Sequence, residues 1–154
     1  MTIARAYGNQ LPQFQNLVEA ERELFAKRDS LLDDLKRAAQ ESARLQLNES
    51  PESLKTLEGW YFDLLAHGHV LASLHLDRET LERALTIYFG AVVVANAPSF
   101  KWFVQEFAFG AGRYEIGVRD QHTQLMLTRG STLEAEPNNK RRQSLYRRFS
   151  RYCK

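Results

Sequence analysis

The sequence predicts an α+β fold with N-terminal helices, a three-stranded antiparallel meander and a C-terminal helix. Two observations support this prediction. Apolar residues recur at helical spacing as far as residue 96, and they then alternate with polar residues between Phe100 and Leu127 before helical spacing returns. Helices followed by a run of strands are typical of α+β domains, in which the helices cover one face of the sheet. The stretch from Leu81 to Val118 holds the longest apolar run and many aromatic residues, so we expect it to build the core.

Length and composition indicate a single domain that spans residues 1–154. Of these residues 44% are hydrophobic and 26% are charged, which suffices for a core without disulfides. The one cysteine, Cys153, allows no intramolecular disulfide, as is usual for a cytoplasmic protein. We find no apolar segment like that of a signal peptide, and no apolar run of the roughly 20 residues that cross a bilayer. We therefore expect a cytoplasmic protein without membrane contact.

The net charge of +2 conceals an asymmetry between the C-terminus and the rest of the chain. Residues 140–154 carry seven Lys or Arg and no acid, whereas the rest of the chain has 14 basic and 19 acidic residues, a net charge of −5. The pattern indicates a mildly acidic body with a basic tail.

Residues 13–47 form the first predicted helical segment. Leucine or alanine recurs every seven residues from Leu17 to Leu45, within a broad apolar stripe that disfavours a coiled coil. One unbroken helix would be about 50 Å long, whereas a compact domain of this size is only about 38 Å across. Asp29 and Ser30 could cap a second helix. We therefore leave open a kinked pair of helices or one helix that overhangs the main body, residues 51–152.

Two further helices are predicted before residue 97. Ser50 suits an N-cap and Pro51 the first helical position. Gly68 ends this helix, and Asp77 caps the next one. Three consecutive valines favour a strand over residues 91–96, but the spacing of the apolar residues before them favours a helix through about residue 96. We favour the helix and keep the strand as the alternative.

The period of the pattern then changes from about four to two. Phe100, Trp102 and Val104 point to one face of a first strand, and a glycine-rich turn leads to a second strand that begins at Tyr114. A third strand contains Leu125. Pro137 is expected to begin the last helix, whose apolar face consists of Leu145, Phe149 and Tyr152.

Three histidines are the best candidates for a metal site. His67, His69 and His75 lie close together, and imidazole is a common metal ligand. However, Gly68 indicates a helix end, where the helix dipole by itself favours histidine. We expect no metal and no cofactor.

Signals of catalysis are equally weak. Cys153 stands next to the C-terminal residue, where chains are often frayed. Glu106 and Glu115 could form a carboxylate pair across the first hairpin, as acid–base chemistry requires. A solvated strand face explains both residues equally well. We therefore expect that the protein is not an enzyme.

Two groups of residues are candidates for binding a partner. The first is the basic face of the last helix, which could hold phosphates or an acidic protein surface: Arg141, Arg142, Arg147 and Arg148. The second is a set of phenylalanines that alternate partly onto the sheet face away from the expected helices: Phe103, Phe107 and Phe109. Exposed aromatics and arginines are favoured in protein interfaces. Alternatively, the N-terminal helices cover this face.

The segment Tyr88-Phe89-Gly90, followed by Trp102 at the start of a strand, resembles a pattern of small bacterial immunity proteins. In that pattern an acidic residue follows the glycine, where this chain has Ala91. The resemblance covers residues 77–152 and implies that the protein neutralises a cognate toxin by direct contact. Tyr88, Gly90 and Trp102 would have structural roles, with Trp102 buried. A nucleic-acid-associated regulator that uses the basic last helix is the alternative function, and a homodimer is left open.

Overall fold

The computed structural model describes residues 8–128 and 143–153, without the side chains of residues 69–71, and it has an α+β fold. Helices α2 (Leu17–Ala43), α3 (Ser53–Ala66), α4 (Gly68–Ser73) and α5 (Arg78–Asn96) precede the sheet. Strands β1 (Lys101–Glu106), β2 (Tyr114–Arg119) and β3 (Gln124–Met126) pair in that order, and α6 (Ser144–Tyr152) follows. The predicted fold class is therefore confirmed.

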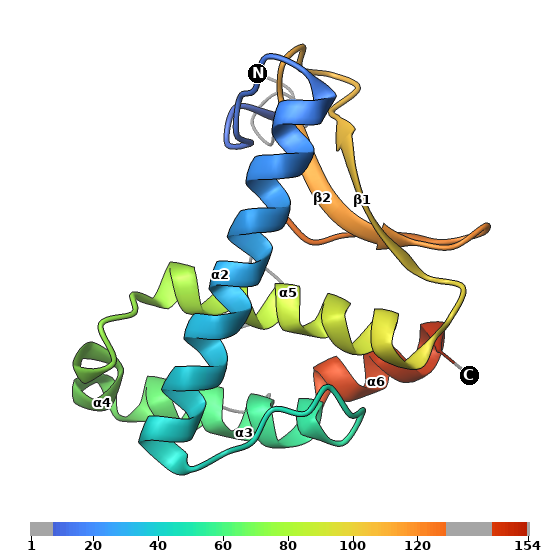
Figure 1. The fold of residues 1–154 in the computed structure, drawn as a ribbon. Helices are drawn as coiled ribbons and strands as arrows, with labels where there is room; N and C mark the ends of the chain where they lie inside the picture. Colours follow the sequence, from blue (N-terminus) through green and yellow to red (C-terminus); the bar gives the residue numbers. More distant parts are fainter. Residues whose placement is uncertain (1–7, 129–142, 154) are drawn as a thin grey trace.

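Helix α2 is one continuous helix of 27 residues, not a kinked pair. The Asn16 side chain caps its start by accepting a hydrogen bond from the Glu19 backbone N–H at 2.9 Å. Arg44, in the left-handed region, ends it. Figure 1 shows why this length fits: α2 runs from the sheet at one end of the molecule to α3 at the other. The helix contacts α3, α5, β1 and β2 and so joins the two ends.

Helix α3 begins at Ser53, two residues after the position expected from Pro51. The expected Ser50 cap is not formed, because Glu52 is the N-cap and its side chain makes no capping hydrogen bond. The Ser50 hydroxyl accepts a hydrogen bond from the Ser53 backbone N–H at 3.2 Å in the turn that precedes the helix. The helix ends at Ala66, and Gly68 then begins the short helix α4.

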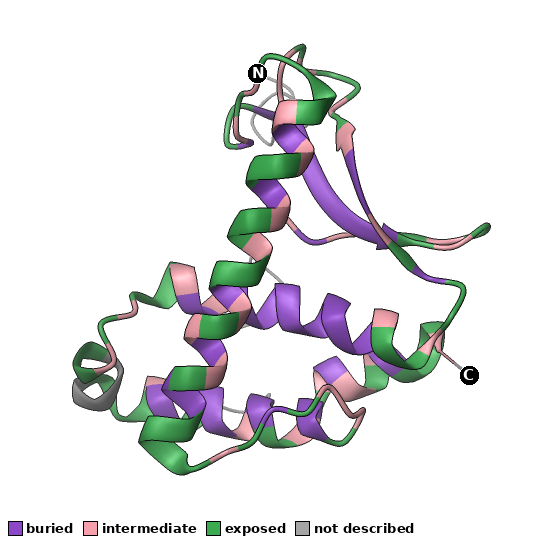
Figure 2. Ribbon diagram, in the orientation of Figure 1, coloured by how far each residue is buried: buried purple, intermediate pink, exposed green. Residues whose placement is uncertain are grey.

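Helix α5 begins after Asp77, whose carboxylate accepts a hydrogen bond from the Thr80 backbone N–H. It continues through the three valines to Asn96, as we favoured from the spacing. Figure 2 shows it buried along most of its length. Because Val92 and Val93 are completely buried, the free energy of packing outweighs the preference of valine for strands.

The sheet is an antiparallel meander with one face against the helices. Val104 pairs with Ile116, and Trp102 pairs with Val118. Side chains that pair across strands share a face, and Val104, Ile116 and Val118 belong to the main core with residues of α2 and α5. Phe103 pairs with Gly117 on the opposite face.

Helix α6 packs against α3 and α5. Leu145 and Phe149 are buried, but Tyr152 is 38% exposed, so the predicted apolar face is one residue shorter than expected. Tyr152 is the last residue of the helix. Pro137 lies outside the described residues.

Candidate functional site

The phenylalanines predicted to bind a partner lie in different environments. Phe103 is only 6% exposed, and the Arg119 guanidinium carbon lies 4.4 Å from the centre of its ring. The ring also lies over Gly117, where a Cβ would come within 3.1 Å of it. Phe103 is therefore not available to a partner, although it lies on the sheet face away from α2 and α5.

Phe107 and Phe109 lie in the loop between β1 and β2. Their rings meet edge to face with centroids 5.7 Å apart. Phe107 is half-buried, whereas Phe109 is 72% exposed. Phe109 is therefore the one member of the predicted set that faces solvent fully.

The backbone of this loop is closed by hydrogen bonds of its own. Phe107 N donates to Arg113 O at 2.7 Å, and Arg113 N donates to Gly110 O at 3.1 Å. Gly112, with a φ of 76°, donates its N–H to the Glu106 carboxylate at 3.1 Å. Glycine adopts this left-handed conformation at little cost. The loop thus holds Phe109 in a defined position.

The segment before α2 braces the loop from one side. Phe14 N donates to Gly112 O at 3.0 Å, and Tyr114 N donates to Pro12 O at 3.1 Å. The Arg113 guanidinium donates to Leu11 O at 2.7 Å. These contacts place the start of α2 beside the loop, at the upper end of the molecule in Figure 1.

Three of the four large hydrophobic side chains that are exposed in the described residues lie at this end. They are Leu17 (45%), Val18 (74%) and Phe109 (72%). We call these three residues together with Phe107 the apolar tip. A groove lined by Gln13, Phe14, Gln15, Glu19 and Gly112 runs beside it. Sequence periodicity had assigned Leu17 to the core stripe and did not distinguish it from the buried leucines.

Of the four arginines expected to form a basic binding face, the structure describes Arg147 and Arg148. Arg141 and Arg142 lie outside the described residues. Arg147 is exposed, but the Arg148 guanidinium carbon lies 5.4 Å from the centre of the buried Phe89 ring. Arg148 therefore takes part in packing α6 onto α5.

Tyr88, Gly90 and Trp102 have packing roles in the structure. The Tyr88 hydroxyl is fully buried, accepts a hydrogen bond from Glu49 N at 2.8 Å and bonds Ser53 Oγ at 2.7 Å. Burial raises the pKa of Tyr88. Gly90 lies inside α5, where an added Cβ would overlap Cδ1 of Leu127 and approach the Trp102 ring to 2.9 Å.

Trp102 is half-buried rather than buried, so this expectation is wrong. The strand phase is correct, because Trp102 packs against the core together with its cross-strand partner Val118. However, β1 is an edge strand of the sheet, and the Arg28 guanidinium carbon lies 5.1 Å from the Trp102 ring centre. A cation, and not an apolar side chain, covers that part of the indole.

The two carboxylates considered for catalysis lie on opposite faces of the sheet. Glu106 pairs with Tyr114, whereas Glu115 pairs with Gln105 and accepts a hydrogen bond from its amide at 3.1 Å. They cannot act on one substrate atom together. Among the described residues no three His, Cys, Asp or Glu side chains come together as a metal site.

A buried carboxyl that sequence reasoning missed is Glu58 of α3. Its side chain is 1% exposed, and Oε1 accepts a hydrogen bond from Ser144 N at 3.0 Å. Oε2 has no hydrogen-bond partner among the residues that the structure describes. Removal from water raises the pKa of Glu58, and the backbone hydrogen bonds at the start of α6 oppose this shift. Glu58 lies four residues after the buried Leu54 and therefore on the same helix face, and this spacing was the indication in the sequence that Glu58 is buried.

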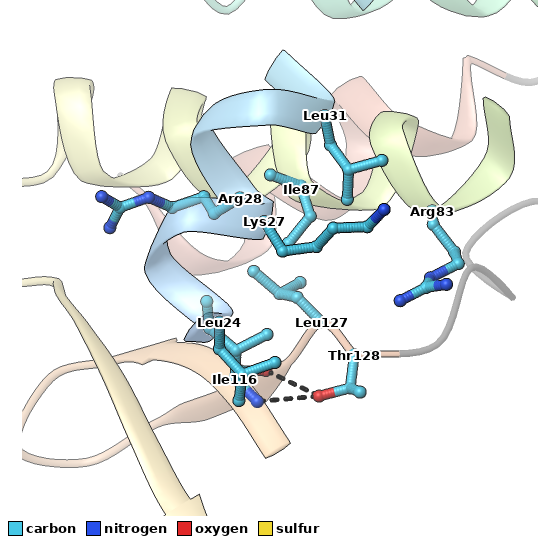
Figure 3. Close-up of a pocket in the computed structure, with 9 residues that line it drawn as sticks. All are labelled: Leu24, Lys27, Arg28, Leu31, Arg83, Ile87, Ile116, Leu127 and Thr128. Atoms are coloured by element: carbon cyan, nitrogen blue, oxygen red, sulfur yellow. Dashed lines mark hydrogen bonds between the residues drawn. The ribbon is translucent and has the colours of Figure 1, made fainter. Parts of the chain in front are cut away.

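A second feature that the sequence did not reveal is a shallow pocket between α2, α5 and β2. Its apolar part consists of Leu24, Leu31, Ile87, Ile116 and Leu127. Lys27, Arg28, Arg83 and Thr128 complete the lining. Figure 3 shows the Lys27 side chain extending across the pocket toward Arg83, whereas the Arg28 guanidinium points away. The cations come from helices some 55 residues apart in the chain, so no local pattern connects them.

Fold and surface define an α+β chain with an apolar tip and a pocket lined partly by cations. The chain belongs to the YwmA family of uncharacterised proteins, whose family model matches residues 13–153. The uncharacterised protein YwmA of Bacillus subtilis (strain 168) is 29% identical over 115 residues, which cover 75% of this chain and 72% of that protein. No solved structure matches the chain. Among the described residues, no helix combines the length and apolar character that a membrane span requires.

Proposed function

We propose that this chain is a non-enzymatic binding protein whose apolar tip contacts a partner protein. The observation that carries this proposal is Phe109, which is 72% exposed on a loop held by backbone hydrogen bonds. Exposed apolar groups are tolerated singly, but a cluster of them on one surface is typical of interaction sites.

The physical advantage of the tip is preorganisation. A partner that binds a fixed aromatic side chain does not have to order the loop, so less free energy is lost on association. Aromatic anchors of this kind often contribute most of the binding free energy in protein interfaces. The contacts of Phe14, Arg113 and Gly112 serve this purpose by fixing the base of the loop.

We further propose that the partner is a bacterial toxin domain, which the chain neutralises in the cytoplasm. This choice rests on the resemblance carried by Tyr88, Gly90 and Trp102, because the family and the relative are both described as uncharacterised. Tyr88, Gly90 and Trp102 pack within the fold, so we expect the toxin to bind elsewhere, at the apolar tip.

The test is a binding measurement between this chain and the purified toxin domain encoded upstream of it. We expect a one-to-one complex by calorimetry and loss of toxin activity on complex formation. Phe109→Ser should weaken the complex by about thirtyfold or more, as removal of an interface anchor does. Tyr152→Ser is the matched control, because Tyr152 is an exposed aromatic on α6, away from the tip. It should change the affinity less than twofold.

Two results would contradict the proposal. Equal effects of the two variants would exclude the tip as the binding surface. Absence of a complex with the toxin domain would exclude the toxin as the partner. Salt-dependent binding of nucleic acid that is lost in Arg147→Gln and Arg151→Gln would instead favour the alternative function, since both arginines are exposed on α6.

A further inference from the structure

The outer edge of β1 carries backbone groups that point away from the rest of the sheet. β1 is an edge strand and pairs on one side only, with β2. The hydrogen bond from Phe107 N to Arg113 O at 2.7 Å sets the alternation along this pair, and it turns the odd-numbered residues of β1 toward β2. The N–H and C=O groups of Trp102, Val104 and Glu106 therefore point outward.

Hydrogen bonds on the other side of β2 agree with this alternation. Tyr114 N donates to Pro12 O at 3.1 Å, and Ile116 N donates to the Thr128 hydroxyl at 2.7 Å. The even-numbered residues of β2 thus turn their backbone groups away from β1, as the even-numbered residues of β1 turn theirs away from β2. Within residues 8–128 and 143–153, the outward backbone groups of β1 form no hydrogen bond.

An open strand edge of this kind pairs readily with another strand. Between residues 101 and 106 the described strand has neither a proline nor a bulge, and Lys101 places a charge only at its first position. Val104, at the middle of the edge, is 8% exposed, so water reaches its backbone only in part. An unpaired backbone N–H or C=O in such a place costs free energy. The edge is therefore stabilised by a strand that satisfies these groups.

We propose that β1 pairs with β1 of a second copy of this chain, antiparallel and about a twofold axis at Val104. In this register Val104 lies opposite Val104 of the second copy, and Trp102 lies opposite Glu106 of the second copy. The three outward residues of each strand then all pair, with two hydrogen bonds for each pair. The two sheets become one continuous sheet, and the interface is isologous, as in most homodimers.

The charges beside the edge favour a second copy over an unrelated strand. The Trp102 side chain shares a sheet face with Val104, and the Arg28 guanidinium carbon lies 5.1 Å from its ring centre. Side chains opposite one another on paired strands lie about 5 Å apart, so the register brings Glu106 of the second copy beside this guanidinium. Arg28 pairs with Asp29 at 2.9 Å, but a guanidinium has several further donors. The twofold axis forms this contact twice.

The experiment is amide hydrogen exchange of the whole chain, followed by NMR at two protein concentrations about a hundredfold apart, with sedimentation velocity on the same samples. We expect a dimer in the concentrated sample and a monomer in the dilute one. The amides of Trp102, Val104 and Glu106 should exchange slowly only in the dimer. Phe103 and Gln105 are internal controls, because their amides bond to β2 and should be protected in both samples.

Three variants test the register and separate it from the apolar tip. Glu106→Gln keeps an oxygen for Gly112 N but removes the charge beside Arg28, so it should raise the Kd of the dimer by about fivefold. Glu41→Gln is the matched control, since Glu41 is exposed near the end of α2 that contacts α3, and it should leave this Kd unchanged. Phe109→Ser should also leave it unchanged, because Phe109 lies outside β1.

Several results would overturn this proposal. A chain that is monomeric in both samples would exclude the dimer. Self-association without protection of the three outward amides would place the contact elsewhere on the surface. Protection of these amides in a monomer would show that the chain covers the edge itself. Equal Kd values for Glu106→Gln and Glu41→Gln would exclude the register. Because all these measurements use the chain alone, they are independent of the toxin-binding test.

Discussion

The Glu58 carboxylate of α3 accepts a hydrogen bond from the backbone N–H of Ser144, the first residue of α6, at 3.0 Å. The two residues are 86 positions apart, and the contact is partly buried, since Glu58 is 1% exposed and Ser144 is half-buried. The bond caps a helix that lacks a side-chain cap of its own. The hydrogen bond therefore links α6 to α3, but it requires that the Glu58 carboxyl be removed from water, which costs free energy.

Replacement of Glu58 should show this cost. Glu58→Gln keeps an oxygen acceptor for Ser144 N and removes the charge, so we expect equal or greater stability at pH 7. Glu58→Ala removes the cap and leaves a cavity, and should lower the free energy of unfolding by about 2 kcal/mol or more. Chemical denaturation measures both. A Glu58→Gln variant as unstable as Glu58→Ala would show that the charge itself is needed.

The same carboxyl predicts a pH dependence with a definite sign. Burial raises the pKa of Glu58 above the ordinary value of a glutamate side chain. Its contribution to stability is therefore fully present below the unfolded pKa and is lost as the pH rises through the folded pKa. The stability of the wild type relative to Glu58→Gln should fall between pH 4 and the folded pKa. Glu41→Gln, an exposed change on α2, serves as the control and should show no such trend.

Gly90 and Gly59 form a matched pair of helical glycines. An added Cβ at Gly90 would overlap Leu127, whereas at Gly59 it would meet nothing within 4 Å. Alanine is favoured over glycine in helices by about 1 kcal/mol, but overpacking costs about 1–3 kcal/mol. We therefore expect Gly90→Ala to destabilise and Gly59→Ala to stabilise the protein. Equal effects of the two changes in thermal denaturation would contradict the close packing of α5 against Leu127.

The Tyr88 hydroxyl joins α5 to the segment before α3. Tyr88→Phe would leave Glu49 N without its acceptor and Ser53 Oγ without its buried partner. Loss of such buried hydrogen bonds costs about 1–3 kcal/mol. Urea denaturation should show this loss. Tyr152→Phe is the control, because its side chain is partly exposed and should leave stability unchanged.

Trp102 and Arg28 provide a test of the interaction at the sheet edge. Because Trp102 is half-buried, Trp102→Ala should cost less than the roughly 3–5 kcal/mol of a fully buried aromatic residue. A double-mutant cycle with Arg28→Met should give a coupling energy of about 0.5–1 kcal/mol, as for other cation–π pairs near solvent. A coupling of zero would show that Arg28 covers the indole without stabilising it.

The sequence by itself determined the order and type of the longer elements, but it predicted only a connector where the short helix α4 lies. Apolar spacing is a local property, so it correctly predicted the end of α5 near Asn96 and the three strands, and Asp77 was correctly predicted as a cap. Where the sequence left α2 open between one helix and two, the choice depended on what the helix contacts. Only the tertiary structure supplies those contacts, on β1 and β2 at one end and on α3 at the other.

Only the tertiary structure decided which side chains are exposed and which distant side chains lie together. Phe103 and Phe109 have the same side chain and lie six positions apart, yet one lies under Arg119 and the other faces solvent. Lys27 and Arg83 line the same pocket because α2 and α5 pack side by side, and Glu58 reaches Ser144 because α6 returns to α3. Whether a side chain is buried or paired with a charge depends on neighbours that come from distant parts of the chain. A sequence pattern, in contrast, shows only which residues are close to one another along the chain.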